Sequence, residues 1–467
     1  MADVVFKEAR EQARLIRDGA LSAEALMAAT YDQIERVNPT VNALVDLLPR
    51  EEALARARLS DAQGEGLLKG LPVAVKDLAN AQAFRTTMGS PRLAGAGPVS
   101  SDDVFVARMR AAGAIVIGKT NTPEFGLGSH TFNPVHSATR NPWDVTRSAG
   151  GSSGGATVAL ACGMVSLADG SDMMGSLRNP AGWSNTYGLR PSWGLVPSEP
   201  KRDMFLHQLS TAGPMARTPG DLELLLRVMA GRDPRQPHGR ALEPAEMPTR
   251  IAWLSDWGGA YACEDGVLAL CEAALPHLSA CGASYDTPSV PFPADQIWQA
   301  WTTLRSWQVA ASLSSLFAQP AGRTGLKEEA LWELNRGLSF SAMEVHRASV
   351  TRSAWFSAAM AFFASYDVIA LPTAQVFPFP VDDRWPTQIG STAMDTYHRW
   401  MEVTVPASLI GLPAIAVPAG FSAEGLPMGL QFIGRPGTDL GLIELARRWH
   451  AATPWCDARP PCAMPPA

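Results

Sequence analysis

The sequence predicts an α/β fold in a single large domain, with a partly parallel sheet covered by helices. Its 467 residues are 46% hydrophobic and 18% charged, enough apolar material to bury a large core. A strand pattern at 70–77, "GLPVAVKD", is followed by a helix pattern at 102–113 and a second strand pattern at 114–120. This order is typical of a crossover between parallel strands. The length would also allow two to four smaller domains, but no internal repeat is visible, which favours one.

Residues 1–65 are expected to form an N-terminal helical region that packs on the core. The segment 22–37, "SAEALMAATYDQIERV", places Ala23, Met27, Tyr31 and Ile34 on one helix face. Ser22 stands where an N-cap would be, and "RVNPTVN" at 36–42 predicts a turn.

The α/β core is expected to cover residues 66–455. Within it, "GATVALACGMVSLA" at 155–168 predicts a packed helix, and the proline-rich stretch 231–250 a surface connection. A strand is expected at 250–256, a helix at 264–282, helical spacing at 295–345, and further strands in "YDVIALPTA" and "LPAIAVPAGF". Residues 456–467, which end in "PPCAMPPA", are expected to be a loose C-terminal tail.

Charge and hydropathy exclude several classes of ligand. The net charge of −6 and the absence of a long Lys and Arg run argue against nucleic acid as a direct ligand. The charged opening, "MADVVFKEAREQARLIRDGA", lacks the apolar stretch of a secretory signal, so a cytoplasmic location is expected. The most apolar stretches are too short or too interrupted by Pro and Gly to span a membrane, so no membrane contact is expected.

Cysteine and histidine spacing gives no metal signature. The six cysteines are expected to be scattered free thiols, although Cys456 and Cys462 could pair if oxidised. The eight histidines form no HExxH pattern, and His130 and His136 are interpreted as polar loop residues. We therefore expect neither a metal nor a cofactor.

A glycine-rich stretch, "RSAGGSSGGAT" at 147–157, is the most informative local motif. A Walker loop would need Lys and then Ser or Thr after its last glycine, whereas Gly155 is followed by "ATVALAC". A flexible linker does not fit either, because the run leads directly into an apolar helix pattern. The remaining interpretation is that the glycines shape the backbone where a helix begins, and that the run carries two hydroxyl groups, those of Ser152 and Ser153.

This stretch and several other blocks resemble the amidase signature family. "GGSSGG" is followed by "SDMMGSLRNPA", which places Ser176 24 residues after Ser152. "LKGLPVAVKDLA", "VARMRAAGAIVIGKTNTPEFG", "STAGPMARTPGDLELLLRVMAG" and "GLPAIAVPAGFSAEGLPMGLQFIGRP" stand in the family's order. The likeness covers nearly the whole chain and is weakest from about Val290 to Ser365. It implies a twisted mixed sheet sandwiched between helical layers.

The resemblance also implies a role for each motif residue. Ser176 would be the nucleophile, Ser152 a bridging serine after a cis Gly151–Ser152 bond, and Lys76 the base. Backbone N–H groups of Met173, Met174, Gly175 and Ser176 would form the oxyanion hole. Ser153, Asp172 and Arg178 would support these loops.

Lysine chemistry sets a condition on this assignment. Lys76 must be neutral to take a proton, and moving its pKa from ~10.4 to near 7 costs about 4–5 kcal/mol, which burial can supply. If 70–77 is a strand, Lys76 shares a face with Ala74, while Asp77 points to the other side. A direct Asp77 ion pair, which would raise the pKa of Lys76, is then avoided.

The chain departs from the family pattern near the nucleophile. Met174 stands where glycine is usual, and methionine adopts φ > 0 only at a cost, so residue 174 is expected in the α or β region or under strain. Trp183 stands where a smaller aromatic is common. Met88, Gly128, Trp183 and Phe205 are the candidate residues of the substrate pocket, and Met174 and Trp183 point to a bulky apolar or aromatic substrate.

The expected activity is hydrolysis of a small apolar or aryl carboxamide by water, with anilides, aryl carbamates (urethanes) or esters as variants. One alternative is the glutaminase subunit of a tRNA-dependent amidotransferase, although Asn179 stands where that subunit has Gln. Another is an inactive binding homologue, if Met174 spoils the oxyanion hole. The Trp-rich segment 298–308 is interpreted as core packing, with one wall of an aromatic cleft as the alternative. A homodimer is compatible with the sequence.

Overall fold

An eleven-stranded sheet organises the computed structural model, which describes residues 4–63, 65–199, 203–314, 316 and 325–464. The strand order is β1-β3-β2-β4-β6-β5-β12-β13-β9-β7-β8, and β10 and β11 form a separate pair. The strands are β1 (Leu44–Val45), β2 (Pro72–Lys76), β3 (Ile115–Thr120), β4 (Leu167–Asp172), β5 (Tyr187–Arg190), β6 (Thr211–Ala216), β7 (Arg250–Trp253), β8 (Ser284–Asp286), β9 (Val368–Pro372), β10 (Gln388–Ile389), β11 (Thr392–Ala393), β12 (Ala414–Phe421) and β13 (Pro427–Gly434).

The sheet is mixed, as the sequence predicts. β2 pairs in parallel with β3 and β4, and β7 pairs in parallel with β8 and β9, whereas the strands between these groups are antiparallel. The helix α5 (Val104–Ala111) lies in the chain between β2 and β3, so the predicted crossover unit is confirmed.

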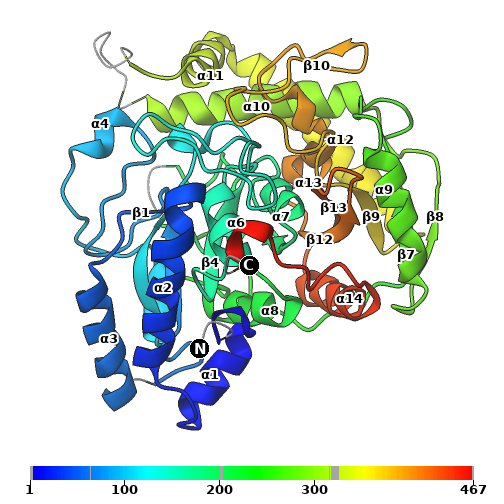
Figure 1. The fold of residues 1–467 in the computed structure, drawn as a ribbon. Helices are drawn as coiled ribbons and strands as arrows, with labels where there is room; N and C mark the ends of the chain where they lie inside the picture. The colour runs from blue at the N-terminus through cyan, green and yellow to red at the C-terminus, as the bar shows by residue number, and fades with distance from the viewer. Residues whose placement is uncertain (1–3, 64, 200–202, 315, 317–324, 465–467) are drawn as a thin grey trace.

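Helices cover both flanks of the sheet (Figure 1). Helices α1 to α3 lie along one flank, α9 lies beside β7 and β8 on the other, and α10 to α12 lie over the top of the view. The remaining bounds are α1 (Ala9–Arg17), α2 (Ala23–Val41), α3 (Arg50–Gln63), α4 (Pro91–Ala94), α6 (Gly154–Ala161), α7 (Asn179–Trp183), α8 (Pro219–Met229), α9 (Val267–Ala274), α10 (Ala294–Leu313), α11 (Glu328–Ser339), α12 (Ala342–Phe362), α13 (Val405–Leu409) and α14 (Asp439–Ala452). Short 3-10 helices are η1 (Val4–Phe6), η2 (Glu124–Gly126), η3 (Leu275–Leu278), η5 (Arg399–Thr404) and η6 (Pro461–Ala463).

Helix α2 begins where the sequence predicts and ends later. The Ser22 side chain accepts a hydrogen bond from the Ala25 N–H, which confirms the N-cap. The expected turn at 36–42 is wrong in position, because the helix continues past Pro39 to Val41 and turns at Asn42, which has a φ of 52°. Burial of Val37 and Val41 favours the extra turn of helix.

Helix α6 is shorter than its apolar run. It ends at Ala161, and Gly163 reverses the chain with a φ of 68° before β4 begins at Leu167. Both elements are buried, so hydrophobicity alone does not mark the boundary between them.

The described part of the C-terminal tail, 456–464, is docked rather than loose. The Ala463 carbonyl accepts hydrogen bonds from Arg36 Nη2 at 2.6 Å and from Gln33 Nε2 at 3.2 Å, and both residues lie on α2. Cys462 Sγ lies 3.8 Å from Cys162 Sγ, so Cys162, and not Cys456, is its thiol neighbour. Residues 465–467 of the expected tail lie outside the described residues.

None of the described helices combines the length and hydrophobicity that crossing a bilayer requires.

Candidate active site

Lys76 lies at the end of β2, in the middle of the parallel part of the sheet. Its side chain is buried, with 1% of the residue exposed. Nζ lies within hydrogen-bond distance of three hydroxyls: Ser152 Oγ at 2.7 Å, Ser153 Oγ at 2.9 Å and Ser171 Oγ at 3.1 Å. The lysine and the serines of the glycine-rich loop are therefore in direct contact.

Burial lowers the pKa of Lys76 to about 7, and the carboxylates of Asp169 and Asp172 only partly oppose this shift. Asp77, the next residue, faces away, as strand alternation predicts. Its carboxylate accepts from Thr87 N–H at 3.0 Å and lies 3.8 Å from Lys119 Nζ. A substantial fraction of Lys76 is consequently neutral near pH 7.

The glycine-rich loop needs glycine for close backbone approach. The Gly151–Ser152 peptide bond is cis, as the resemblance implies. Gly150 has a φ of 74°, and a Cβ there would lie 2.5 Å from Asn179 Oδ1. A Cβ on Gly155 would lie 2.3 Å from Asn121 N. No larger side chain fits at either position without moving these neighbours.

Asp172 shapes the loop that carries Ser176. Its carboxylate accepts from the N–H groups of Gly175 at 2.9 Å and Leu177 at 3.1 Å. Of the four N–H groups expected to form an oxyanion hole, that of Gly175 is bonded to Asp172, which leaves those of Met173, Met174 and Ser176 as candidates. The contacts of the described residues give these three N–H groups no acceptor.

Two buried arginines hold Asp172 in place. Arg178 Nε donates to Asp172 Oδ2 at 3.0 Å, and Arg190 Nη1 donates to Oδ1 at 3.2 Å. Burial alone would raise the pKa of Asp172, but the two guanidinium groups outweigh it and lower the pKa. Arg178 also donates to the Thr404 carbonyl at 3.0 Å and to Ser408 Oγ at 2.8 Å. Asp172 and Arg178 thus form one buried network that holds the loop of Ser176 at Gly175 and reaches Thr404 and Ser408.

Met174 fits its loop without left-handed backbone. It is not among the residues with positive φ, whereas the following Gly175 has a φ of 78°. Of the two alternatives expected for residue 174, the strained one does not arise, since the left-handed conformation falls on the glycine. The Met174 side chain is 4% exposed and lines a cavity.

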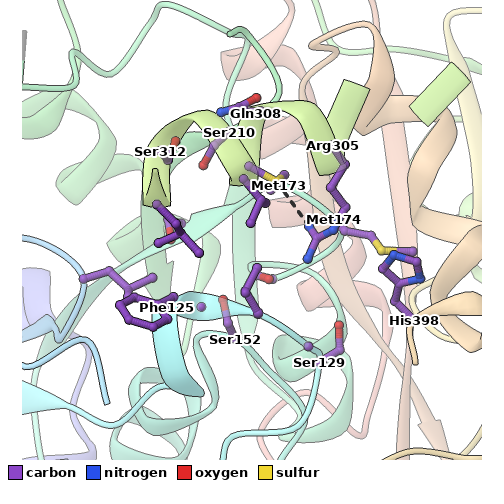
Figure 2. A pocket seen from close by; sticks show the side chains of 18 residues that line it. Phe125, Ser129, Ser152, Met173, Met174, Ser210, Arg305, Gln308, Ser312 and His398 are labelled. Atoms are coloured by element: carbon purple, nitrogen blue, oxygen red, sulfur yellow. Dashed lines mark hydrogen bonds between the residues drawn. The ribbon is translucent and has the colours of Figure 1, made fainter. Parts of the chain in front are cut away.

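Ser152 and Ser176 border one cavity of about 250 Å³, shown in Figure 2. Apolar and polar side chains both line it: Leu78, Phe125, Leu127, Met173, Met174, Val309 and Leu313, with Ser129, Ser171, Ser210, Arg305, Gln308, Ser312 and His398. A second cavity, of about 460 Å³, shares Ser171 and Ser210 and reaches Lys76. The three motif residues thus border two neighbouring cavities that share part of their lining.

Only one of the four expected pocket residues lines this cavity. Gly128 does, whereas Met88, Trp183 and Phe205 do not. Trp183 is fully buried and its ring stacks on Trp400 with centroids 5.7 Å apart. Phe205 is 60% exposed, and the Met88 carbonyl accepts a hydrogen bond from the N–H of the cavity residue Phe125.

Sequence reasoning missed Arg305, Gln308 and His398 as cavity residues. Arg305 and Gln308 lie in α10, within the Trp-rich segment interpreted as core or cleft wall. Both interpretations hold in part, because Trp298 and Trp301 are buried against His398, while Arg305 and Gln308, one and two turns further along the same helix, meet the cavity. A charged residue inside an apolar helix was the available signal.

His130 acts as a polar loop residue, as expected. Its Nδ1 lies 2.7 Å from Ser148 Oγ and its Nε2 lies 2.9 Å from the Val381 carbonyl.

Comparison with known proteins agrees with this architecture. A family model described as Amidase matches residues 25–443. An acylamidase of Rhodococcus erythropolis is 32% identical over 471 residues, which cover 97% of this chain and 96% of its own. A glutamyl-tRNA(Gln) amidotransferase subunit of a Picosynechococcus species is 32% identical, and the match covers 94% of this chain and 96% of its own.

Among solved structures, a bacterial aryl acylamidase of the amidase signature family superposes with a TM-score of 0.91, at 26% identity over 99% of both chains. Fold and family together define an enzyme that hydrolyses C–N bonds of amides. The chain belongs to the amidase signature family.

Proposed function

We propose that this chain hydrolyses small apolar or aryl carboxamides through an acyl-enzyme on Ser176, with Ser152 as proton bridge and Lys76 as base. The observation that supports this most directly is the 2.7 Å contact between Lys76 Nζ and Ser152 Oγ. It lies beside a cavity that Ser152 and Ser176 both border.

The hydrogen bonds of Lys76 suit a neutral amine. Such an amine has two N–H groups, for Ser153 and Ser171, and one lone pair that can accept the Ser152 hydroxyl proton. A group that is uncharged at working pH can take a proton in the transition state.

The proposed reaction has two halves. Ser176 Oγ attacks the amide carbonyl while its proton passes to Ser152 and the Ser152 proton passes to Lys76. The same relay returns a proton to the departing amine as the C–N bond breaks. Water then attacks the ester, releases the acid and restores Ser176.

The N–H groups of Met173, Met174 and Ser176 are the proposed oxyanion donors. Among the described contacts, no hydrogen bond joins Ser152 Oγ to Ser176 Oγ. Catalytic hydrogen bonds commonly tighten only when substrate is bound.

The apolar side chains of the cavity support an apolar or aryl substrate. Phe125, Leu127, Met173, Met174 and Val309 provide surface for a ring or alkyl chain. Likeness to an acylamidase and an aryl acylamidase agrees with this choice. Anilides are the first expectation, with aryl carbamates and esters as variants that pass through the same acyl chemistry.

A glutaminase subunit is the second candidate, because glutamyl-tRNA(Gln) amidotransferase subunits match the chain almost as well as the acylamidase does. Asn179 instead of Gln, and the Met173–Met174 pair, count against it.

The decisive experiment uses the purified chain without other proteins or ATP. Aliphatic amides, anilides, aryl carbamates, peptide amides and glutamine are offered to wild type and to Ser176→Ala. We expect anilide turnover by wild type only, and a fluorophosphonate adduct on Ser176. Turnover of glutamine alone would favour the glutaminase, and absence of both turnover and adduct would indicate a binding protein.

A further inference from the structure

Arg305 brings a buried guanidinium to the wall of the active-site cavity. Its side chain is 5% exposed. Nε donates to Glu333 Oε1 at 2.6 Å, and Nη2 donates to the Tyr397 hydroxyl at 2.8 Å. Nη1 donates to the Met173 thioether, with Sδ at 3.1 Å.

The Met173 thioether is a poor hydrogen-bond partner for Arg305 Nη1. A thioether sulfur is a weak acceptor, whereas a guanidinium N–H is a strong donor. Figure 2 shows Arg305, Met174 and His398 at one end of the cavity and Phe125 at the other, with Met173 beside α10 and a dashed line from its sulfur to Arg305. Met173 is flexible enough to move aside for a better acceptor.

Charge balance limits what that acceptor can be. The Glu333 carboxylate is already the direct counter-ion of Arg305, and its other oxygen accepts from Ser306 Oγ. Burial first, and then the nearby arginines, lower the pKa of His398, so this imidazole adds no positive charge. A substrate carboxylate would therefore place a second negative charge on a guanidinium that is already paired, whereas an uncharged acceptor leaves the Arg305–Glu333 charge balance unchanged.

We propose that Arg305 is a specificity-determining residue, which selects amides whose distal end carries an uncharged hydrogen-bond acceptor such as a ketone, ester or ether oxygen. The acceptor replaces Met173 Sδ on Nη1. The inference depends on the proposed function in one respect: it takes the amide substrate to be the ligand of this cavity.

The test reads binding without turnover, in a Ser176→Ala background, by isothermal titration calorimetry. Two near-isosteric probe pairs place the acceptor on either side of the amide. They are para-acetylbenzamide with para-isopropylbenzamide, and para-acetylacetanilide with para-isopropylacetanilide. In at least one pair the acetyl compound should bind tighter than the isopropyl compound, and Arg305→Met should reduce that preference about 10-fold or more.

A matched control is Arg336→Met. Arg336 stacks on Trp332 and donates to Thr302 Oγ1 in the same cluster, but it does not line the cavity, so the preference should survive. Should Arg305→Met not fold, Arg305→Lys keeps a cation for Glu333 and lacks the forked donor, and it should lose the preference equally.

The inference is overturned if neither pair shows an acetyl preference, if Arg305→Met retains it, or if para-carboxybenzamide binds tighter than para-acetylbenzamide. A different result would show that the proposed function is wrong while the inference holds. In that case the acetyl compounds would still bind tighter in an Arg305-dependent way, but the wild-type chain would hydrolyse none of the amides.

Discussion

Lys76 Nζ lies 2.7 Å from Ser152 Oγ, although the two residues are 76 positions apart in the chain. The lysine ends a buried strand and the serine precedes a buried helix, so packing of α6 against the sheet brings them together. The predictions below test what this contact does.

Activity should rise with pH through about 7 and then level off. The folded pKa of Lys76 is about 7, and only the neutral amine above that pKa can act as base. A pH profile of kcat/KM with an anilide measures this. A flat or acid-favoured profile would contradict Lys76 as base.

The free energy of unfolding should also increase with pH because of Lys76. Lys76 titrates near 7 when folded and at its ordinary 10.5 when unfolded, so between these values the unfolded chain binds more protons and stability increases with pH. The slope from this group is about 1.4 kcal/mol per pH unit at most. Urea unfolding of wild type and Lys76→Met at several pH values isolates it. Equal slopes for the two proteins would refute the shifted pKa.

Ser152 and Ser153 should differ although both contact Lys76. Removing the bridging hydroxyl in Ser152→Ala should lower kcat by about 100-fold or more, because a proton relay is lost. Ser153→Ala removes only a supporting hydrogen bond and should cost about 10-fold or less. Stopped-time anilide assays decide, and a larger loss in Ser153→Ala would reverse the assignment.

Met174 should contribute to selection of large acyl groups. Met174→Gly removes a buried side chain from the cavity wall and relieves no left-handed strain. We expect kcat/KM for an aryl amide to fall about 10-fold relative to acetamide, in line with ~1.5 kcal/mol of lost apolar contact. Acetamide turnover on the same preparation is the internal reference. An unchanged ratio would place the aryl group elsewhere.

Asp172 should be needed for both stability and activity. Asp172→Asn leaves the buried Arg178 and Arg190 without their counter-ion, which typically costs about 3–5 kcal/mol. It also disturbs the Gly175 N–H bond that shapes the nucleophile loop. Asp221→Asn is the control, since that buried carboxylate accepts the Ala9 and Arg10 N–H groups and should affect unfolding without lowering kcat. Full activity of Asp172→Asn would show that the hydrogen bonds from Asp172 to the Ser176 loop are not needed for catalysis.

Local patterns predicted the elements whose signals lie within the element itself. The β2–α5–β3 unit and the Ser22 cap follow from alternation and capping chemistry. Strand β4, "LADGSD", was not predicted because it is rich in small and polar residues and its first two residues continue the apolar run that begins in α6. The docking of the C-terminal tail was not predicted because its partners, Gln33 and Arg36, lie more than 400 residues earlier in the chain.

Some residues of the candidate site could likewise be predicted from local sequence motifs, and others could not. Motif resemblance located Lys76, Ser152 and Ser176, which the structure places around two neighbouring cavities with shared lining residues. It could not locate Arg305 or His398, because their position depends on how α10 and η5 pack over the sheet. Trp183 was misplaced for the converse reason, since an aromatic residue near the nucleophile in sequence packs behind the cavity wall.

The contacts that Arg178 makes with Thr404 and Ser408 join the loop of Ser176 to a segment more than 200 residues later in the chain. A polypeptide that stops before Thr404 lacks both acceptors, so its loop with the proposed nucleophile has no anchor on that side, although Lys76, Ser152 and Ser176 are all present.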